Sequence, residues 1–195
     1  RSSPEVNAGS MADIAFLLLI FFLVTTTIET DSGISRKLPP IEESEEDVII
    51  KQKNIFTVIL NGKDQLLVED EVMELEELRD AAIKFLDNGG GSGEDKCDYC
   101  KGAGDPKSSD NPDKAIISLK NERETTYATY ISVQNELVAA YTSLRNQRAE
   151  ELFGLSYTEM LKNYKDVNWP GSKSKLKENI TQIKLEYPQK LSEVQ

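Results

Sequence analysis

The chain has 195 residues, a formal net charge of −11, two cysteines and no histidine. The acidic balance argues against a phosphate-binding surface for nucleic acid, and an acidic domain is repelled by anionic lipid headgroups. The absence of histidine removes the commonest general base, metal ligand and proton shuttle, and two cysteines are too few for a disulfide framework.

An apolar run from Met11 to Ile28 predicts a transmembrane helix. It contains one charged residue, and at about 1.5 Å per residue it extends over roughly 27 Å, close to the hydrocarbon thickness of a bilayer. A cleaved signal peptide is one alternative, although Glu5 before the run and the threonines at its exit do not fit one. A buried core helix is the other alternative, because the run is hydrophobic on all sides.

Asp13 lies within a turn of the start of this run. An ionised carboxylate there costs several kcal/mol unless it is paired, hydrated or protonated, so such residues usually face a partner helix or a path of water. The alternative is an interfacial acid that only interacts favourably with the helix dipole. Helical spacing places five further residues on the face of Asp13: Phe16, Leu17, Ile20, Val24 and Thr27.

The stretch Asn7-Ala8-Gly9-Ser10-Met11-Ala12-Asp13, the LLLIFFLVTTT run and the pair Leu38-Pro39 resemble the ExbD/TolR family of biopolymer transport proteins. That family has an asparagine six residues before a membrane aspartate, an apolar run and a Leu-Pro pair at the start of its periplasmic part. The chain departs from the family at Gly9 and Ser10, where Thr-Pro is common.

The resemblance implies that Asp13 is an ion-translocating aspartate, with Asn7, Thr25 and Thr27 as supporting pore residues. It also implies a single-pass protein of the Gram-negative inner membrane, with a cytoplasmic N-terminus and a periplasmic domain. Two copies of the anchor helix would sit inside a ring of ExbB-like or TolQ-like multi-span subunits. Proton flow through this complex would be coupled to a TonB-like or TolA-like protein working at the outer membrane.

Two points about the anchor stay open at this stage. A single carboxylate among apolar side chains suits H⁺ better than Na⁺, but the three threonines leave Na⁺ as an alternative. The chain begins at Arg1 rather than at methionine, and we expect residues before it to carry the basic charge of the cytoplasmic flank.

The predicted organisation has four parts. Residues 1–10 form the cytoplasmic flank, residues 11–28 the transmembrane helix and residues 29–47 a polar, flexible periplasmic tether. Residues 48–195 form a small two-layer α+β domain, the fold that the resemblance also implies.

Within this domain the sequence predicts a hairpin, with Phe56–Leu60 and Leu66–Val68 alternating around Asn61-Gly62. A helix over residues 75–85, a strand over residues 115–119 and a long helix closing near Gly154 follow. The tail predicts a helix that ends before Pro188 and a short strand over residues 190–194, which would add to the edge of the sheet and offer a pairing edge to an extended peptide.

Residues 88–113 form a polar insertion that contains Cys97-Asp98-Tyr99-Cys100. A disulfide between the two cysteines is one reading, given an oxidising compartment. Zinc shared with a second copy, or completed by Asp95 and Asp98, is another, because the chain supplies only two thiolates. A redox-catalytic motif fits poorly, because such motifs lie at a helix N-terminus after a strand.

Three function classes follow from these features. The first is an energy transducer whose intramembrane carboxylate carries an ion. The second is a passive, membrane-tethered periplasmic binding module, and the third is a membrane-bound thiol oxidoreductase. The sequence shows no nucleophile–base pair and no phosphate loop, so we expect no conventional enzyme activity.

Overall fold

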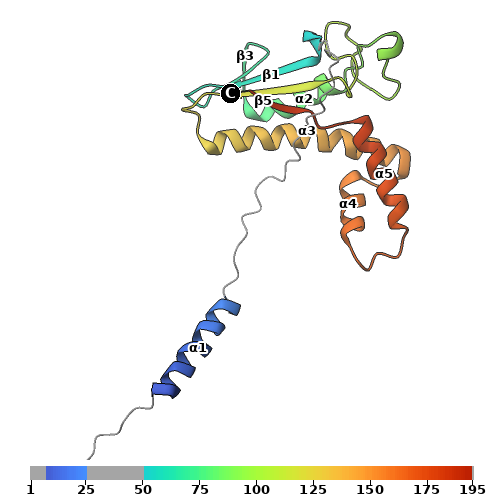
Figure 1. The fold of residues 1–195 in the computed structure, drawn as a ribbon. Helices are drawn as coiled ribbons and strands as arrows, with labels where there is room; N and C mark the ends of the chain where they lie inside the picture. Colours follow the sequence, from blue (N-terminus) through green and yellow to red (C-terminus); the bar gives the residue numbers. More distant parts are fainter. Residues whose placement is uncertain (1–7, 26–50, 195) are drawn as a thin grey trace, which may run out of the picture. The chain divides into compact units, whose positions relative to one another are not determined.

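The computed structural model describes residues 8–25 and 51–194 and divides the chain into two compact units, Arg1–Asp47 and Val48–Gln195. The second unit is hereafter the folded domain. In the first unit, helix α1 (Ala8–Thr25) is drawn in blue in Figure 1. Leucine, alanine and methionine favour a helix here, and neither glycine nor proline follows Gly9 within it.

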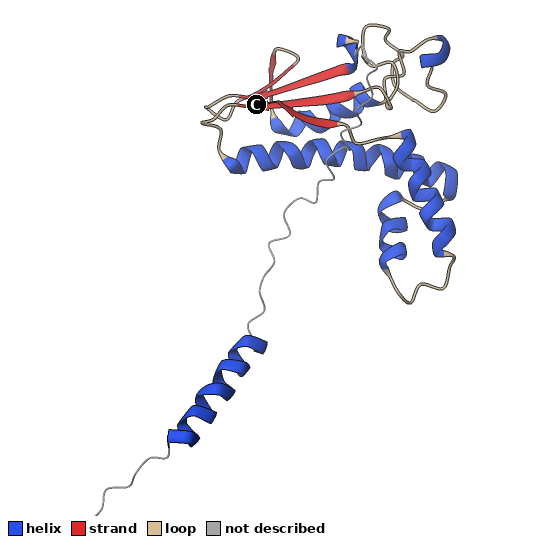
Figure 2. Ribbon diagram, viewed as in Figure 1, coloured by secondary structure: helices blue, strands red, loops and turns tan. Residues whose placement is uncertain are grey.

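The folded domain contains a five-stranded sheet in the order β3-β2-β1-β4-β5 (Figure 2). β2 is antiparallel to both β1 and β3, whereas β4 is parallel to both β1 and β5. The strands are β1 (Ile55–Leu60), β2 (Leu66–Val68), β3 (Glu71–Met73), β4 (Ile116–Asn121) and β5 (Leu191–Val194).

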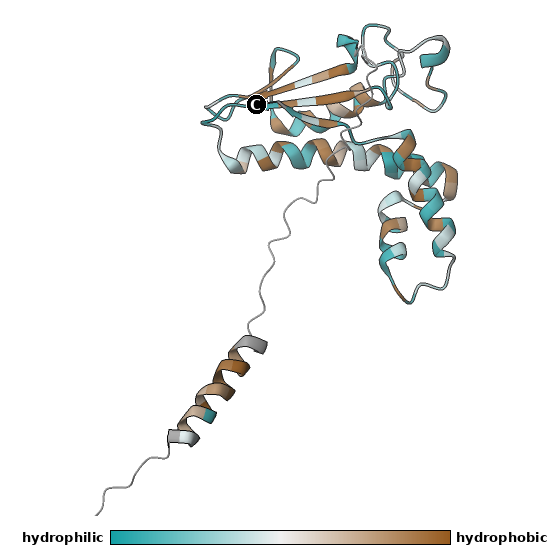
Figure 3. Ribbon diagram, in the orientation of Figure 1, coloured by the Kyte–Doolittle hydropathy of each residue, from teal (hydrophilic) through white to brown (hydrophobic). Residues whose placement is uncertain are grey.

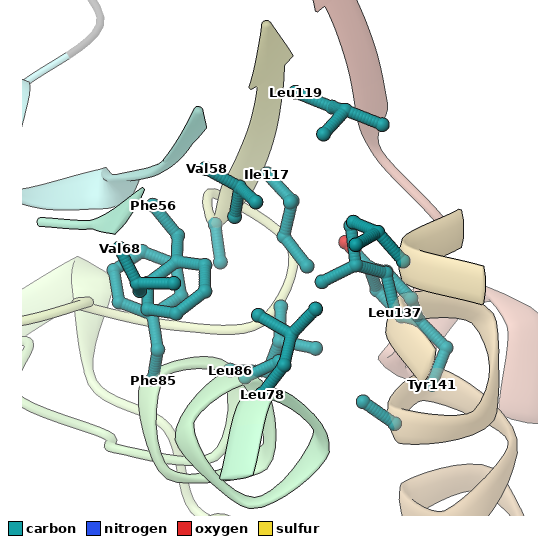
Figure 4. Packing of buried hydrophobic residues seen from close by; sticks show 14 of the residues in the cluster. Phe56, Val58, Val68, Leu78, Phe85, Leu86, Ile117, Leu119, Leu137 and Tyr141 are labelled. Atoms are coloured by element: carbon teal, nitrogen blue, oxygen red, sulfur yellow. The ribbon is translucent and has the colours of Figure 1, made fainter. Parts of the chain in front are cut away.

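Two helices, α2 (Leu75–Leu86) and α3 (Tyr127–Phe153), cover one face of this sheet (Figure 1). Alternate side chains of β1 and β4 are buried beneath them, which is the period-two pattern of a strand with one covered face. Figure 4 shows the resulting core, in which side chains of the sheet meet those of both helices: Phe56, Val58, Val68, Ile117, Leu78, Phe85, Leu86, Leu137 and Tyr141.

The limits of α3 follow from its capping residues. The Thr126 side chain accepts a hydrogen bond from the backbone N–H of Thr129, which satisfies one free donor of the first turn. At the other end Gly154 adopts φ of 69°, in the left-handed region, and its N–H donates to the Glu150 carbonyl. Glycine carries no penalty in that conformation, so the helix stops there.

Beyond Gly154, helices α4 (Tyr157–Lys165) and α5 (Lys173–Glu186) pack on the end of α3 around a second, smaller core. Arg145 on α3 connects this core with the first. Its Nε and Nη2 both donate to the Tyr187 carbonyl, at 2.9 and 2.7 Å, and its guanidinium lies 5.5 Å from the ring centroid of Tyr157. The tail of the chain is therefore part of the domain rather than an appendage.

The predicted α+β class is confirmed, and so are the hairpin, the two covering helices, the central strand, the tail helix before Pro188 and the edge strand after it. One strand and one α-helix were missed, besides two short 3-10 helices, Gln52–Asn54 and Gly93–Asp95. β3 follows β2 directly as a short, mostly exposed strand, and α4 occupies the start of the tail.

Candidate functional site

The predicted ion-carrying residue, Asp13, lies in the second turn of α1 and is the only charged residue of that helix. The large hydrophobic side chains described around it are exposed, with between 43% and 62% of their surface accessible. They are Met11, Ile14, Phe16, Leu17, Leu18, Leu19, Ile20, Phe21 and Phe22, and Figure 3 shows the apolar colouring of this segment. The described part of α1 thus surrounds one carboxylate with uncovered apolar surface.

The predicted transmembrane span is not confirmed. Over the residues that the structure describes, no helix combines the length and the apolar character that crossing a membrane requires. The predicted span runs to Ile28, and residues 26–28 lie outside the described residues. The assignment of residues 11–28 to the membrane therefore stays a prediction.

The predicted supporting residues are not placed around Asp13 by the structure. Asn7 and Thr27 lie outside the described residues, and Thr25 ends α1 without a described side chain. Their contribution to an ion path also stays a prediction.

The zinc interpretation of the insertion is wrong for this structure. The Sγ atoms of Cys97 and Cys100 are bonded to each other, which leaves neither thiolate to hold a metal. Among the described residues, Asp95 and Asp98 included, no group of three or more cysteine, aspartate or glutamate side chains could hold a metal ion. The disulfide reading is the one that the structure shows.

The geometry of the CxxC motif does not support the redox-catalytic interpretation. The residues after Cys100 continue as loop until β4, so the CxxC motif does not open a helix. The stabilisation of a thiolate by a helix N-terminus is therefore absent at this motif in the described part of the chain.

One side of the insertion is fastened to the residues before β1 by ion pairs. The buried carboxylate of Asp110 receives the ammonium groups of Lys51, at 3.2 Å, and of Lys53, and the amide of Asn54, at 3.3 Å. Burial raises the pKa of Asp110, but these hydrogen bonds outweigh that effect and the net shift is downward. The carboxylate therefore stays ionised and holds the loop against the start of β1.

A second carboxylate of the insertion, Asp95, extends this cluster. It accepts from Lys114 and from Lys51, the latter at 2.8 Å. These two hydrogen bonds lower the pKa of Asp95 to about 2. Lys51 thus bridges Asp95 and Asp110 where the described part of the folded domain begins.

The other side of the insertion is fastened to the α5–β5 junction through Tyr99, which lies between the two bonded cysteines. Its hydroxyl donates to the Glu186 carbonyl at 2.7 Å, and its ring packs edge-on against Tyr187 at 5.4 Å. The guanidinium of Arg148 lies 5.1 Å from the Tyr99 ring centroid. Burial raises the pKa of Tyr99 to about 12, so this hydroxyl remains a donor at neutral pH.

Asp87, just after α2, completes this junction. One carboxylate oxygen accepts from the Tyr187 hydroxyl at 2.9 Å, and the other accepts from the backbone N–H of Lys101 at 3.2 Å. The cavity among these side chains has a volume of about 10 Å³, which is space for about one water molecule. The cluster is therefore a structural junction with no room for a substrate.

These anchoring residues were not identified from the sequence. Carboxylates, lysines and tyrosines are common in polar loops, and nothing in their spacing pairs residues that lie 44 to 100 positions apart. The sequence predicted only a polar insertion, whereas the structure shows it bound both to the residues before β1 and to the α5–β5 junction.

Comparison with known proteins gives one positive result. A family model described as "Biopolymer transport protein ExbD/TolR" matches residues 1–149. The match covers α1, the sheet through β4 and most of α3, and it ends before α4, α5 and β5. A comparison with curated proteins finds no match.

Proposed function

Because the chain belongs to the ExbD/TolR family of biopolymer transport proteins, we propose that it is the ion-carrying subunit of an inner-membrane energy transducer. The family consists of transport-associated proteins rather than enzymes. The observation that carries the proposal is the single carboxylate of Asp13, placed on a helix whose described apolar side chains are all exposed. Such a surface needs a covering from outside the helix.

In the proposed mechanism, residues 11–28 span the membrane and Asp13 takes up a proton from the periplasmic side and releases it toward the cytoplasm. The neutral acid tolerates an apolar surface, whereas the carboxylate requires water or a polar partner. The two protonation states therefore favour different positions of the helix within a ring of ExbB-like or TolQ-like subunits. A proton gradient can drive motion only through such a difference in contacts.

The proposed output passes through the tether of residues 29–47 to the periplasmic domain and on to a TonB-like or TolA-like protein. The geometry of the domain supports this route. Lys51, the first described residue after the tether, is paired with both Asp95 and Asp110, so a pull on the tether acts on the insertion as well as on β1. The insertion in turn contacts the α5–β5 junction through Tyr99.

Substitution of Asp13 tests the proposal. We expect Asp13→Asn to assemble normally and to reduce proton-motive-force-dependent transport by at least about 100-fold, because the amide cannot release a proton. Transport is measured in cells that lack the native subunit, with protein levels checked by immunoblot. Asp13→Glu is the matched control, since it keeps the carboxylate, and it should retain measurable transport.

The passive binding module makes the opposite predictions. It requires that Asp13→Ala leave function intact and that the chain purify without a ring partner. Native mass spectrometry of the detergent-solubilised protein, co-expressed with its genomic neighbour, separates the two. Two copies of the chain within a ring of multi-span subunits support the transducer, whereas a lone monomer or simple dimer supports the passive module.

A further inference from the structure

A basic surface lies at the tip formed by α4 and α5, in the part of the chain beyond the family match. Residues 162–177, hereafter the basic tip, comprise the end of α4, the connecting loop and the start of α5, which Figure 1 shows at the end of the helical pair away from the sheet. This segment carries five lysines and one aspartate, in a chain whose net charge is −11. Glu159 and Glu178 are the nearest acids outside it.

The lysines of the basic tip form no ion pairs with the described carboxylates of the domain. Some lysines elsewhere in the domain pair with carboxylates, as Lys51, Lys101 and Lys114 do. Among the described residues, none of the five tip lysines forms an ion pair, and four of them are exposed while Lys173 is partly exposed. The five are Lys162, Lys165, Lys173, Lys175 and Lys177. Their charge is available to an external anionic surface.

Apolar side chains accompany these charges. Val167 is 86% exposed and Tyr164 is also exposed, although both are side chains that folding normally covers at least in part. Trp169 is partly exposed and lies on the second core. A partly exposed tryptophan with lysines near it in the chain is the composition found where proteins meet a membrane–water interface.

The position of Trp169 depends on Gly171. A Cβ atom on Gly171 would lie 2.1 Å from the Trp169 ring, so only glycine allows the ring to fold over the backbone there. Beneath the ring is an open apolar cavity of about 200 Å³, lined by Phe153, Leu155, Met160 and Leu176, with Lys175 among its polar lining residues. The indole is therefore held at a surface where apolar space and positive charge meet.

We propose that the basic tip docks on the surface of an anionic phospholipid bilayer. The charge complementarity favours lipid, because five lysines that form no ion pair among the described residues lie in the same segment as an exposed valine and a partly exposed tryptophan. Acids of the domain that lie further than about 8 Å from the bilayer are largely screened at physiological ionic strength. Within and beside the tip, the five lysines outnumber the three acids Asp166, Glu159 and Glu178. The proposal rests on the proposed membrane anchor only in that the anchor holds the domain near the bilayer.

Trp169 is the only tryptophan of the chain, so its fluorescence reports on the basic tip alone. The experiment places the full-length protein in nanodiscs of phosphatidylcholine, with and without phosphatidylglycerol, that are bounded by a scaffold without tryptophan. With phosphatidylglycerol we expect a blue shift of the emission, quenching by brominated acyl chains and reversal of both by salt. With phosphatidylcholine alone we expect neither.

Charge reversal makes the test specific. Each lysine near an anionic surface contributes roughly fivefold to binding, so the triple variant Lys173→Glu, Lys175→Glu, Lys177→Glu should lower the docking constant by at least roughly 100-fold. That constant is obtained from quenching as a function of phosphatidylglycerol content. The matched control reverses three exposed lysines outside the tip, Lys63, Lys84 and Lys120, and should leave the quenching unchanged.

Three outcomes would overturn the proposal. Unchanged Trp169 emission in phosphatidylglycerol nanodiscs is the first, and an equal response in phosphatidylcholine is the second. The third is a response only to an added acidic peptide such as polyglutamate, which would assign the surface to a protein partner. Asp13→Asn should leave the Trp169 response intact, so failure of the ion-transfer proposal and failure of lipid docking are separate results.

Discussion

Two aspartates, Asp87 and Asp110, hold the insertion in place at the scale of single residues. Both are buried, and a buried carboxylate is tolerated only when its oxygens are hydrogen-bonded or paired with cations. Asp110 has two lysines and an asparagine, and Asp87 has the Tyr187 hydroxyl and a backbone N–H. Removing one partner of such a group costs more than the hydrogen bond itself, because the charge stays buried.

The substitution Tyr187→Phe tests how much the hydrogen bond to the buried Asp87 carboxylate contributes to stability. We expect the free energy of unfolding to fall by about 2 kcal/mol, since the change removes a donor 2.9 Å from a buried carboxylate oxygen and keeps the ring. The measurement is urea unfolding followed by circular dichroism. Tyr127→Phe is the matched control, because that tyrosine is 77% exposed, and it should change stability by less than about 0.5 kcal/mol. Equal effects of the two substitutions would contradict the account.

The ion pairs of Asp95 make the free energy of unfolding depend on pH in the acid range. The pKa of Asp95 in the folded state is about 2, below the ordinary value of 3.8, so the ionised form stabilises the fold. This contribution is complete above pH 3.8 and is lost as the pH falls from 3.8 toward 2. The stability difference between the wild type and Asp95→Asn should therefore be constant near neutral pH and shrink over this acid range. A difference that does not change with pH would contradict the ion-pair assignment.

At the scale of elements, a strong apolar period is clearest in β1 and α2, both of which were predicted. β1 alternates buried and partly buried residues over six positions, and α2 buries one face at helical spacing. β3 lacks this signal because it is three residues long at the sheet edge, and the turn before it uses Glu69 and Asp70 at positive φ, where no glycine marks it.

α4 could have been found from its capping sequence. It is only nine residues long, and only Tyr157 and Met160 are buried in it, so its apolar pattern covers little more than two turns. Ser156 and Glu159 have the S-x-x-E spacing of a capping box, and the Ser156 hydroxyl accepts from the Glu159 N–H at 3.2 Å. The second core that α4 forms could not be found in this way, because it depends on where α3 ends and α5 returns.

The disulfide belongs to the insertion as an element. It closes a loop of four residues, so the chain-entropy estimate of its contribution is about 2 kcal/mol. We expect the double variant Cys97→Ser, Cys100→Ser to lose hydrogen-exchange protection at insertion amides such as Gly90 and Gly102, which bond to carbonyls of Ser109 and Asp87. Amides of β1 and β4 should keep theirs. Equal loss across the sheet would show that the disulfide stabilises the whole domain.

At the scale of the whole molecule, the family and the fold class could be predicted from the sequence, because short stretches of residues indicate both. The apolar run with one aspartate identified the family within the first forty residues, and the family match then extended to residue 149. The attachment of the insertion could not be predicted, because its partners are far apart in the chain. Lys51 and Asp110 are 59 residues apart, and Tyr99 and Glu186 are 87 residues apart. The same holds for the basic tip, whose lysines are evident in the sequence but whose lack of ion pairs among the described residues is not.

Proton flux through the reconstituted complex tests the central claim most directly. The full-length chain and its ring subunits are placed in liposomes, and a pH gradient is imposed while a trapped fluorescent dye reports the internal pH. We predict flux with the wild type, flux at the level of empty liposomes with Asp13→Asn, and partial flux with Asp13→Glu. Wild-type flux from the Asp13→Asn complex would contradict the assignment of Asp13 as the ion carrier.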